Sequence, residues 1–129
     1  MRTISVFVVG LLLAVVLGGA PVSAYNGIEL SYASVGNFTL VDQNNSEYKL
    51  SDATEEIVVV SFFFTRCPDV CPVITQNLKL VHDTLPEELE DNVGFVAITL
   101  DPKYDTPEVL AEYMARHGVD WPHLTGPTE

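Results

Sequence analysis

The chain has 129 residues, with 18 acidic side chains against 6 basic ones and a formal net charge of −12. The length fits one small domain, and the charge argues against nucleic-acid binding, which needs a basic surface. Because 47% of the residues are hydrophobic, intrinsic disorder is also disfavoured. Two cysteines are too few for a disulfide scaffold or a four-thiolate zinc site. The composition therefore predicts a small, acidic globular domain.

The first 24 residues resemble an export signal. A basic start with Arg2 precedes an apolar run over residues 4–20, and small side chains at Val22 and Ala24 resemble a signal-peptidase site. An uncleaved membrane anchor is the alternative, because the apolar run is close to the ~20 residues that span a bilayer. We expect residues 1–24 to be a signal peptide or membrane anchor and residues 25–34 a linker. The domain at 35–129 would then be extracytoplasmic, either secreted or anchored.

The part that follows this leader is densely acidic, with five basic and 18 acidic side chains. Charge repulsion of this size destabilises a compact state at low ionic strength. At about 1 M salt the screening length falls to about 3 Å, and most of the repulsion disappears. Two interpretations stay open: a protein from a salt-rich habitat, or an ordinary acidic extracytoplasmic protein.

An N-terminal β-hairpin is the first predicted element. Residues 35–41 alternate between apolar and polar side chains, residues 42–46 form a dense turn signal, and residues 47–50 predict a second short strand. Polar residues 51–56 follow. The continuous β-branched and aromatic run at 57–64 is typical of a strand that is buried on both faces.

The next elements alternate between helix and strand. Apolar spacing predicts a helix over residues 71–85, and residues 93–100 predict a second buried strand. Residues 105–108, Asp-Thr-Pro-Glu, form a helix start with a capping side chain, a proline in the first turn and an acid that faces the helix dipole, and Gly118 ends that helix. A hairpin followed by strand, helix, strand and helix predicts an α/β domain with a parallel βαβ core.

The two cysteines follow the first predicted core strand. Cys67 and Cys71 therefore lie at the carboxyl edge of the sheet, where open α/β folds place their sites. The helix that begins there directs N–H groups and a positive dipole end at the sulfurs, which stabilises thiolates. Arg66 adds a positive charge, whereas Asp69 opposes it.

A spacing of four residues brings both sulfurs to one side of the first helical turn. This arrangement suits a disulfide between Cys67 and Cys71, or two soft ligands for a metal such as Cu(I). A purely structural disulfide would constrain the unfolded chain little, because the loop is short. The usual dithiol redox motif has two intervening residues instead of three, and this departure favours metal binding over redox catalysis.

Two motifs carry a family resemblance. The stretch from Phe64 to Pro72, FTRCPDVCP, resembles the signature of the Sco/SenC copper proteins, which are thioredoxin-like factors of cytochrome c oxidase assembly. The stretch from Leu100 to Leu110, LDPKYDTPEVL, resembles the second motif of that family, and residues 124–126 give a weaker third match. Either main motif alone would also admit a peroxiredoxin or another thioredoxin-like protein.

The resemblance implies a function and a ligand set. Cys67 and Cys71 would bind copper, together with a histidine on a late hairpin that has no counterpart in this sequence. We therefore expect a thioredoxin-like α/β fold with an N-terminal β-hairpin that lacks the C-terminal strands and helix. The implied function is a copper chaperone that delivers copper to the copper A site of cytochrome c oxidase subunit II.

An enzyme is the competing class of function. A thiol–disulfide oxidoreductase would reduce the target cysteines before metallation, with one of Cys67 and Cys71 attacking and the other resolving. Peroxidase activity is the third candidate function, after copper delivery and thiol–disulfide exchange. The membrane would be a further partner if the N-terminal segment stays uncleaved.

Five other polar residues are candidates, each with an ordinary structural role. His82 fits a solvent-facing or half-buried position on its helix, and His117 fits a helix end, where an imidazolium favours the dipole. His123 is the one histidine whose strand could return toward the cysteine edge. Asp101 and Asp105 fit turn and cap chemistry, and a contribution to copper handling or partner contact is the alternative.

Overall fold

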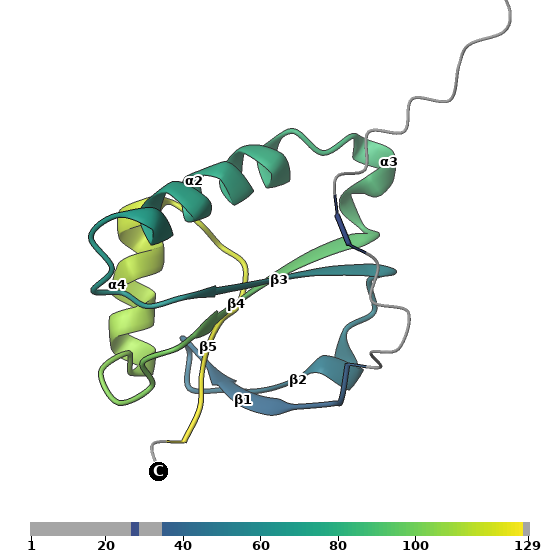
Figure 1. Ribbon diagram of the computed structural model, residues 1–129. Coiled ribbons are helices and arrows are strands. Elements are labelled where there is room, and N and C mark those ends of the chain that lie inside the picture. The colour runs from purple at the N-terminus through teal and green to yellow at the C-terminus, as the bar shows by residue number, and fades with distance from the viewer. Residues whose placement is uncertain (1–26, 29–34, 128–129) are drawn as a thin grey trace, which may run out of the picture. The chain divides into compact units, whose positions relative to one another are not determined.

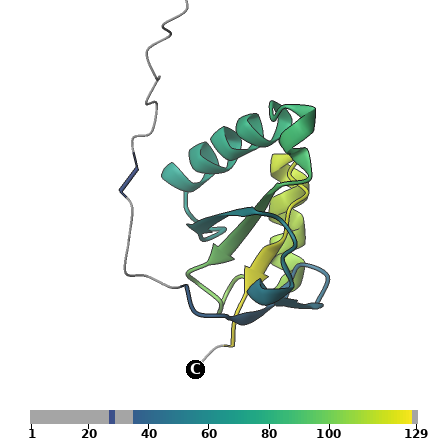
Figure 2. The ribbon, with the colours of Figure 1, turned by 90° about the vertical axis from the view of Figure 1, so that its right-hand side faces the viewer.

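The computed structural model describes residues 27–28 and 35–127, so the expected leader and most of the linker lie outside the described residues. The elements, in chain order, are β1 (Thr39–Asp42), β2 (Glu47–Lys49), η1 (Leu50–Asp52), β3 (Ile57–Phe63), α2 (Val70–Asp83), α3 (Glu87–Glu90), β4 (Val93–Thr99), α4 (Pro107–His117) and β5 (His123–Thr125). Figures 1 and 2 show how these elements are arranged.

The N-terminal hairpin forms as expected, although its first strand is shorter. Strand β1 begins at Thr39 instead of residue 35 and pairs antiparallel with β2. The side chain of Asp42 accepts hydrogen bonds from the backbone N–H groups of Asn44 and Ser46, each at 2.8 Å. Asn45 takes a left-handed conformation with φ of 60°. These contacts explain why the polar run makes a tight turn.

The sheet has the strand order β2-β1-β5-β4-β3. Strands β3, β4 and β5 are parallel, which confirms the βαβ core, and β1 joins β5 in antiparallel pairing. The order of elements predicted from the sequence ends with the helix before Gly118 and does not include β5. This three-residue strand inserts between β1 and β4 and connects the hairpin to the core.

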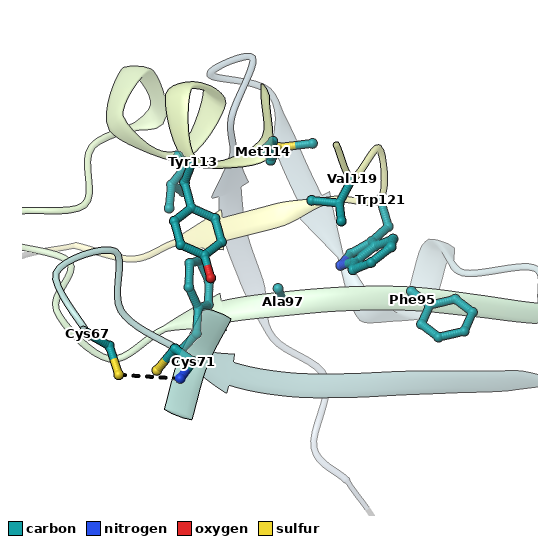
Figure 3. Packing of buried hydrophobic residues seen from close by; sticks show 10 residues of the cluster. Cys67, Cys71, Phe95, Ala97, Tyr113, Met114, Val119 and Trp121 are labelled. Carbon is teal, nitrogen blue, oxygen red and sulfur yellow. Dashed lines mark hydrogen bonds between the residues drawn. The ribbon is translucent and has the colours of Figure 1, made fainter. Parts of the chain in front are cut away.

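Both long helices contribute to one hydrophobic cluster on one face of the sheet (Figure 3). Phe63, Phe95 and Ala97 point toward the helices from β3 and β4, and Leu110, Tyr113 and Met114 meet them from α4. Successive strand residues alternate between faces, so Val60 and Phe62 lie on the other face of the sheet.

The expectation that the 57–64 strand is buried on both faces is wrong. Val60 is 38% exposed and Phe62 is 57% exposed. The reason is position, because β3 is the outermost strand of the described sheet and pairs only with β4. The neighbouring strand β4 does have two buried faces, since Phe95, Val96 and Ala97 are consecutive and all buried.

The helix boundaries differ slightly from expectation. Helix α2 runs from Val70 to Asp83. Helix α4 ends at Gly118, whose φ of 66° is the left-handed conformation that glycine adopts at helix ends. Within residues 27–28 and 35–127, no helix combines the length and the apolar character needed to cross a bilayer.

Candidate functional site: a cysteine pair at a helix N-terminus

The cysteines lie where the chain leaves β3 and enters α2. The backbone N–H of Cys67 donates to the carbonyl of Phe64 at 3.1 Å, which turns the chain sharply after the strand. One helical turn later, the N–H of Cys71 donates to the Cys67 sulfur at 3.4 Å (Figure 3). Cys67 is 8% exposed and Cys71 is 5% exposed, and both carry free thiols. The predicted closeness of the two sulfurs is therefore present.

The two thiols differ in acidity. The pKa of Cys67 lies below its ordinary value, chiefly because the Cys71 side chain hydrogen-bonds to it and also because backbone N–H groups of Asp69, Cys71 and Val70 stabilise the thiolate. Burial and the same hydrogen bond raise the pKa of Cys71. The Cys71 side chain first, and then the local backbone N–H groups, thus decide the balance that the opposed charges of Arg66 and Asp69 left open.

A polar pair lies behind the cysteines. The buried hydroxyl of Thr75 hydrogen-bonds to the carbonyl of Cys71 at 3.0 Å and to the Tyr113 hydroxyl at 2.8 Å. The Tyr113 ring packs against Phe63, with ring centroids 5.1 Å apart. Figure 3 shows Tyr113 reaching from α4 toward Cys71. This hydrogen bond joins α2 to α4, and no local sequence pattern indicated it.

The two aspartates have different environments. Asp101 accepts a hydrogen bond from the guanidinium of Arg66 at 2.6 Å, and that guanidinium lies over the Tyr104 ring at 4.0 Å. Asp105 is fully buried and accepts hydrogen bonds from Thr65 and Thr99. The expectation that Asp105 caps α4 is wrong, because Thr106 occupies the N-cap position and the Asp105 carboxylate turns toward the cysteine loop.

The three histidines take structural positions. The His82 ring packs against the rings of Phe95 and Trp121, which also contact each other. His117 packs its ring on Tyr113 at 4.2 Å, and burial lowers its pKa, which disfavours the imidazolium expected at this helix end.

His123 is 1% exposed, and its ring makes an edge contact with Phe63. Burial lowers the pKa of His123 to about 4, so its ring is neutral at pH 7. The neutral ring donates from Nδ1 to the Trp121 carbonyl at 2.9 Å.

The described residues offer no third side chain for a metal beside the cysteines. No group of three or more His, Cys, Asp or Glu side chains among them is arranged to hold a metal ion. A cavity of about 480 Å³ lies at the other end of the sheet, where its lining includes Val58, Gly94 and Trp121. The cysteine pair is therefore a two-sulfur site that is not part of that cavity.

The fold and the site together define a thioredoxin-like α/β domain with a dithiol pair at the N-terminus of a helix. The family model described as SCO1/SenC matches residues 28–129, and the chain belongs to this family. The resemblance seen in the two sequence motifs is thereby confirmed.

Relatives and solved structures agree with this assignment. The chain is 31% identical over 96 residues to a putative copper-binding protein of Stutzerimonas stutzeri, covering 74% of this chain and 47% of that protein. It superimposes on ScoI of Bradyrhizobium japonicum, solved with copper bound, with a TM-score of 0.65 and 29% identity over 74% of this chain and 60% of that one.

A third match is BsSco, a member of the Sco family of cytochrome c oxidase assembly proteins for which a disulfide switch is described. Its TM-score is 0.64 at 27% identity, over 73% of this chain and 56% of that one. The chain spans about half the length of the curated relatives it matches.

Proposed function

We propose that this chain binds Cu(I) through the thiolates of Cys67 and Cys71 and delivers it to the copper A site of cytochrome c oxidase subunit II. The observation that carries the proposal is the Cys71 N–H directed at the Cys67 sulfur, which holds two soft donors together at the N-terminus of α2. Thiolates are the ligands that Cu(I) prefers. The copper-bound Sco relative and the copper-binding name of the Stutzerimonas protein support the choice of metal.

Transfer would proceed by exchange of ligands. Each thiolate of the target would replace one thiolate of this chain, so copper keeps at least two sulfur donors throughout and no electron is transferred. The acidic Cys67 is the easier thiolate to release, because its pKa is lowered. The raised pKa of Cys71 favours its reprotonation once the metal has gone.

Copper stoichiometry tests this function. The reduced chain should bind about one Cu(I) in competition with a chromophoric chelator, and Cys67→Ser or Cys71→Ser should abolish tight binding, because an alcohol is a poor ligand for a soft metal. Asp83→Ser, on the last turn of α2, is a control that leaves the sulfurs in place. A single cysteine variant with wild-type affinity would contradict the proposal.

The alternative function is thiol–disulfide exchange on the target cysteines. The specific observation in its favour is the split in acidity, since a lowered pKa at Cys67 suits an attacking thiol and a raised pKa at Cys71 suits a resolving one. The Cys67 thiolate would attack the target disulfide, and Cys71 would then displace the second target thiol and leave a Cys67–Cys71 disulfide. A metal-free chain that reduces a peptide disulfide but binds no Cu(I) would favour this enzyme.

We further propose that residues 1–24 export the domain. A fusion of a periplasmic reporter enzyme after Glu129 should be active only with these residues present. Equal reporter activity without them would contradict export.

A further inference from the structure

Thr65 and Arg66 anchor the loop of residues 64–69, which joins β3 to α2 and carries Cys67. Thr65 donates to the Asp105 carboxylate twice, once from its backbone N–H at 3.0 Å and once from its hydroxyl. Arg66 donates to the Asp101 carboxylate at 2.6 Å. Both acceptors lie in the loop between β4 and α4, so the residues immediately before Cys67 are fastened to a different βα connection.

These two attachments form one closed network. The Thr99 hydroxyl donates to Asp105 and accepts the backbone N–H of Asp101 at 3.0 Å. Thr99 thus links the two aspartates, and the chain itself links Thr65 to Arg66. Asp105 is 0% exposed, and the three described hydrogen bonds to its carboxylate all come from Thr65 and Thr99. A buried carboxylate is costly unless such donors surround it, so the network holds one defined geometry.

The geometry points to Asp105 as a positioning residue for the Cys67–Cys71 pair, acting through Thr65. The turn that begins at Phe64 leads directly into Cys67, whose sulfur must meet the N–H of Cys71. Chelation of one metal ion and formation of a disulfide both depend on where the Cys67 sulfur lies relative to Cys71. Release of Thr65 therefore loosens the pair. The part of the inference that concerns copper affinity rests on the proposed function, whereas the part that concerns the dithiol equilibrium does not.

Matched substitutions separate positioning from packing. Thr65→Val keeps the shape and the backbone N–H but removes the hydroxyl, whereas Thr65→Ser keeps the hydroxyl. Thr84→Val, which removes a hydroxyl bonded to Leu80 at the far end of α2, controls for the chemistry of the substitution. Three measurements apply to each variant. They are the Cu(I) affinity by chelator competition, the Cys67–Cys71 disulfide equilibrium in glutathione buffers, and the stability to unfolding in urea.

We expect Thr65→Val to lower Cu(I) affinity by about 10- to 100-fold, the range found when residues that orient metal ligands are lost. It should also shift the dithiol equilibrium, while Thr65→Ser and Thr84→Val stay near wild type in both. Equal Cu(I) affinity and equal dithiol equilibrium in the Val and Ser variants would overturn the inference, even if Thr65→Val is less stable.

A second pair keeps the test decisive if Thr65→Val does not fold. Thr99→Val removes the hydroxyl that links both aspartates, and Thr99→Ser retains it, so the same contrast is expected there. If wild type binds no Cu(I), the proposed function fails, and the dithiol equilibrium alone judges the inference. Val and Ser variants that differ in stability to urea but share the same dithiol equilibrium would then overturn the inference.

Discussion

The backbone N–H of Cys71 points at the sulfur of Cys67 at a distance of 3.4 Å, so the helix that carries one cysteine stabilises the thiolate of the other. The Cys71 side chain adds a hydrogen bond, which is the largest cause of the lowered pKa of Cys67. The pair is therefore asymmetric, although both cysteines lie in one short loop and helical turn.

We predict that Cys67 is alkylated before Cys71 in the reduced chain. Cys71→Ala should raise the pKa of Cys67, because the side-chain donor is lost, whereas Cys71→Ser retains a hydroxyl donor and should raise it less. Thiolate absorbance near 240 nm as a function of pH measures the Cys67 pKa in both variants. An unchanged Cys67 pKa in Cys71→Ala would show that the backbone N–H groups alone suffice.

His123 links stability to mildly acidic pH. Its pKa falls from 6.5 to about 4 on folding, so below pH 6.5 the unfolded chain takes up a proton that the folded chain does not. Stability is present above pH 6.5 and is lost as pH falls toward 4. One pKa unit corresponds to about 1.4 kcal/mol, so we expect a loss of about 2 kcal/mol between pH 7 and pH 5.

Urea unfolding at several pH values tests this link. His123→Gln should remove most of the pH dependence in that window, and His82→Gln serves as the control on a half-buried histidine. If His123→Gln retains the full slope, another group must carry it.

Particular residues show what the sequence could predict. The two core strands and the helix that carries Cys71 are predicted correctly, because apolar runs and apolar spacing are local signals. The strand β5 is expected only as the strand that carries His123 and has no place in the predicted order of elements, because three residues are too few for a period and its partner Ala97 lies 26 positions before His123.

The role of Asp105 shows the limit of local patterns. The run Asp105-Thr106-Pro107 has the composition of a helix cap. The Asp105 carboxylate, however, accepts hydrogen bonds from Thr65, which lies 40 residues earlier. The burial of β3 depended in the same way on which strand lies beside it. Sequence patterns predict the period of an element, whereas tertiary neighbours decide which donors and which faces it meets.

Salt should stabilise this chain. The described ion pairs of Lys and Arg engage Lys49, Arg66 and Lys79, which leaves most of the acidic side chains among the described residues without a Lys or Arg partner there. Thermal melts at low salt and in molar salt should therefore show a rising Tm, because screening removes the repulsion. Replacing Glu87, Glu88 and Glu90 of α3 by Gln should lower the salt dependence.

A Tm that does not rise with salt would reject the hypothesis of a salt-rich habitat. Sucrose at matched osmolality serves as the uncharged control, since it favours compact states without screening charge.

The free edge of β3 should cause self-association. Its N–H and C=O groups face no further strand within the described residues, and Val60 and Phe62 add exposed apolar surface. Such an edge is a template for pairing with a second copy. Sedimentation should show concentration-dependent association that Phe62→Lys reduces, whereas the same added charge in Asn77→Lys, at an exposed position on α2, has a smaller effect. Equal association in both variants would place the contact elsewhere.

Cu(II) should behave differently from Cu(I) at this site. Cu(II) favours a tetragonal set that includes imidazole nitrogen, and the described residues bring no third His, Cys, Asp or Glu to the two sulfurs. His123 is buried with its Nδ1 bonded to the Trp121 carbonyl. We therefore expect two Cu(II) ions to oxidise the dithiol to a Cys67–Cys71 disulfide, with release of two protons and formation of two Cu(I) ions.

Thiolate-to-copper charge-transfer bands measure this outcome. They should be absent or decay as the disulfide forms, and thiol titration should show the loss of both free thiols. The variant Cys71→Ser controls for the oxidation, since it cannot form the internal disulfide. Bands that persist in wild type would contradict the prediction, and their disappearance in His123→Gln would then identify that imidazole as the third ligand, because the variant removes the ring and leaves both sulfurs.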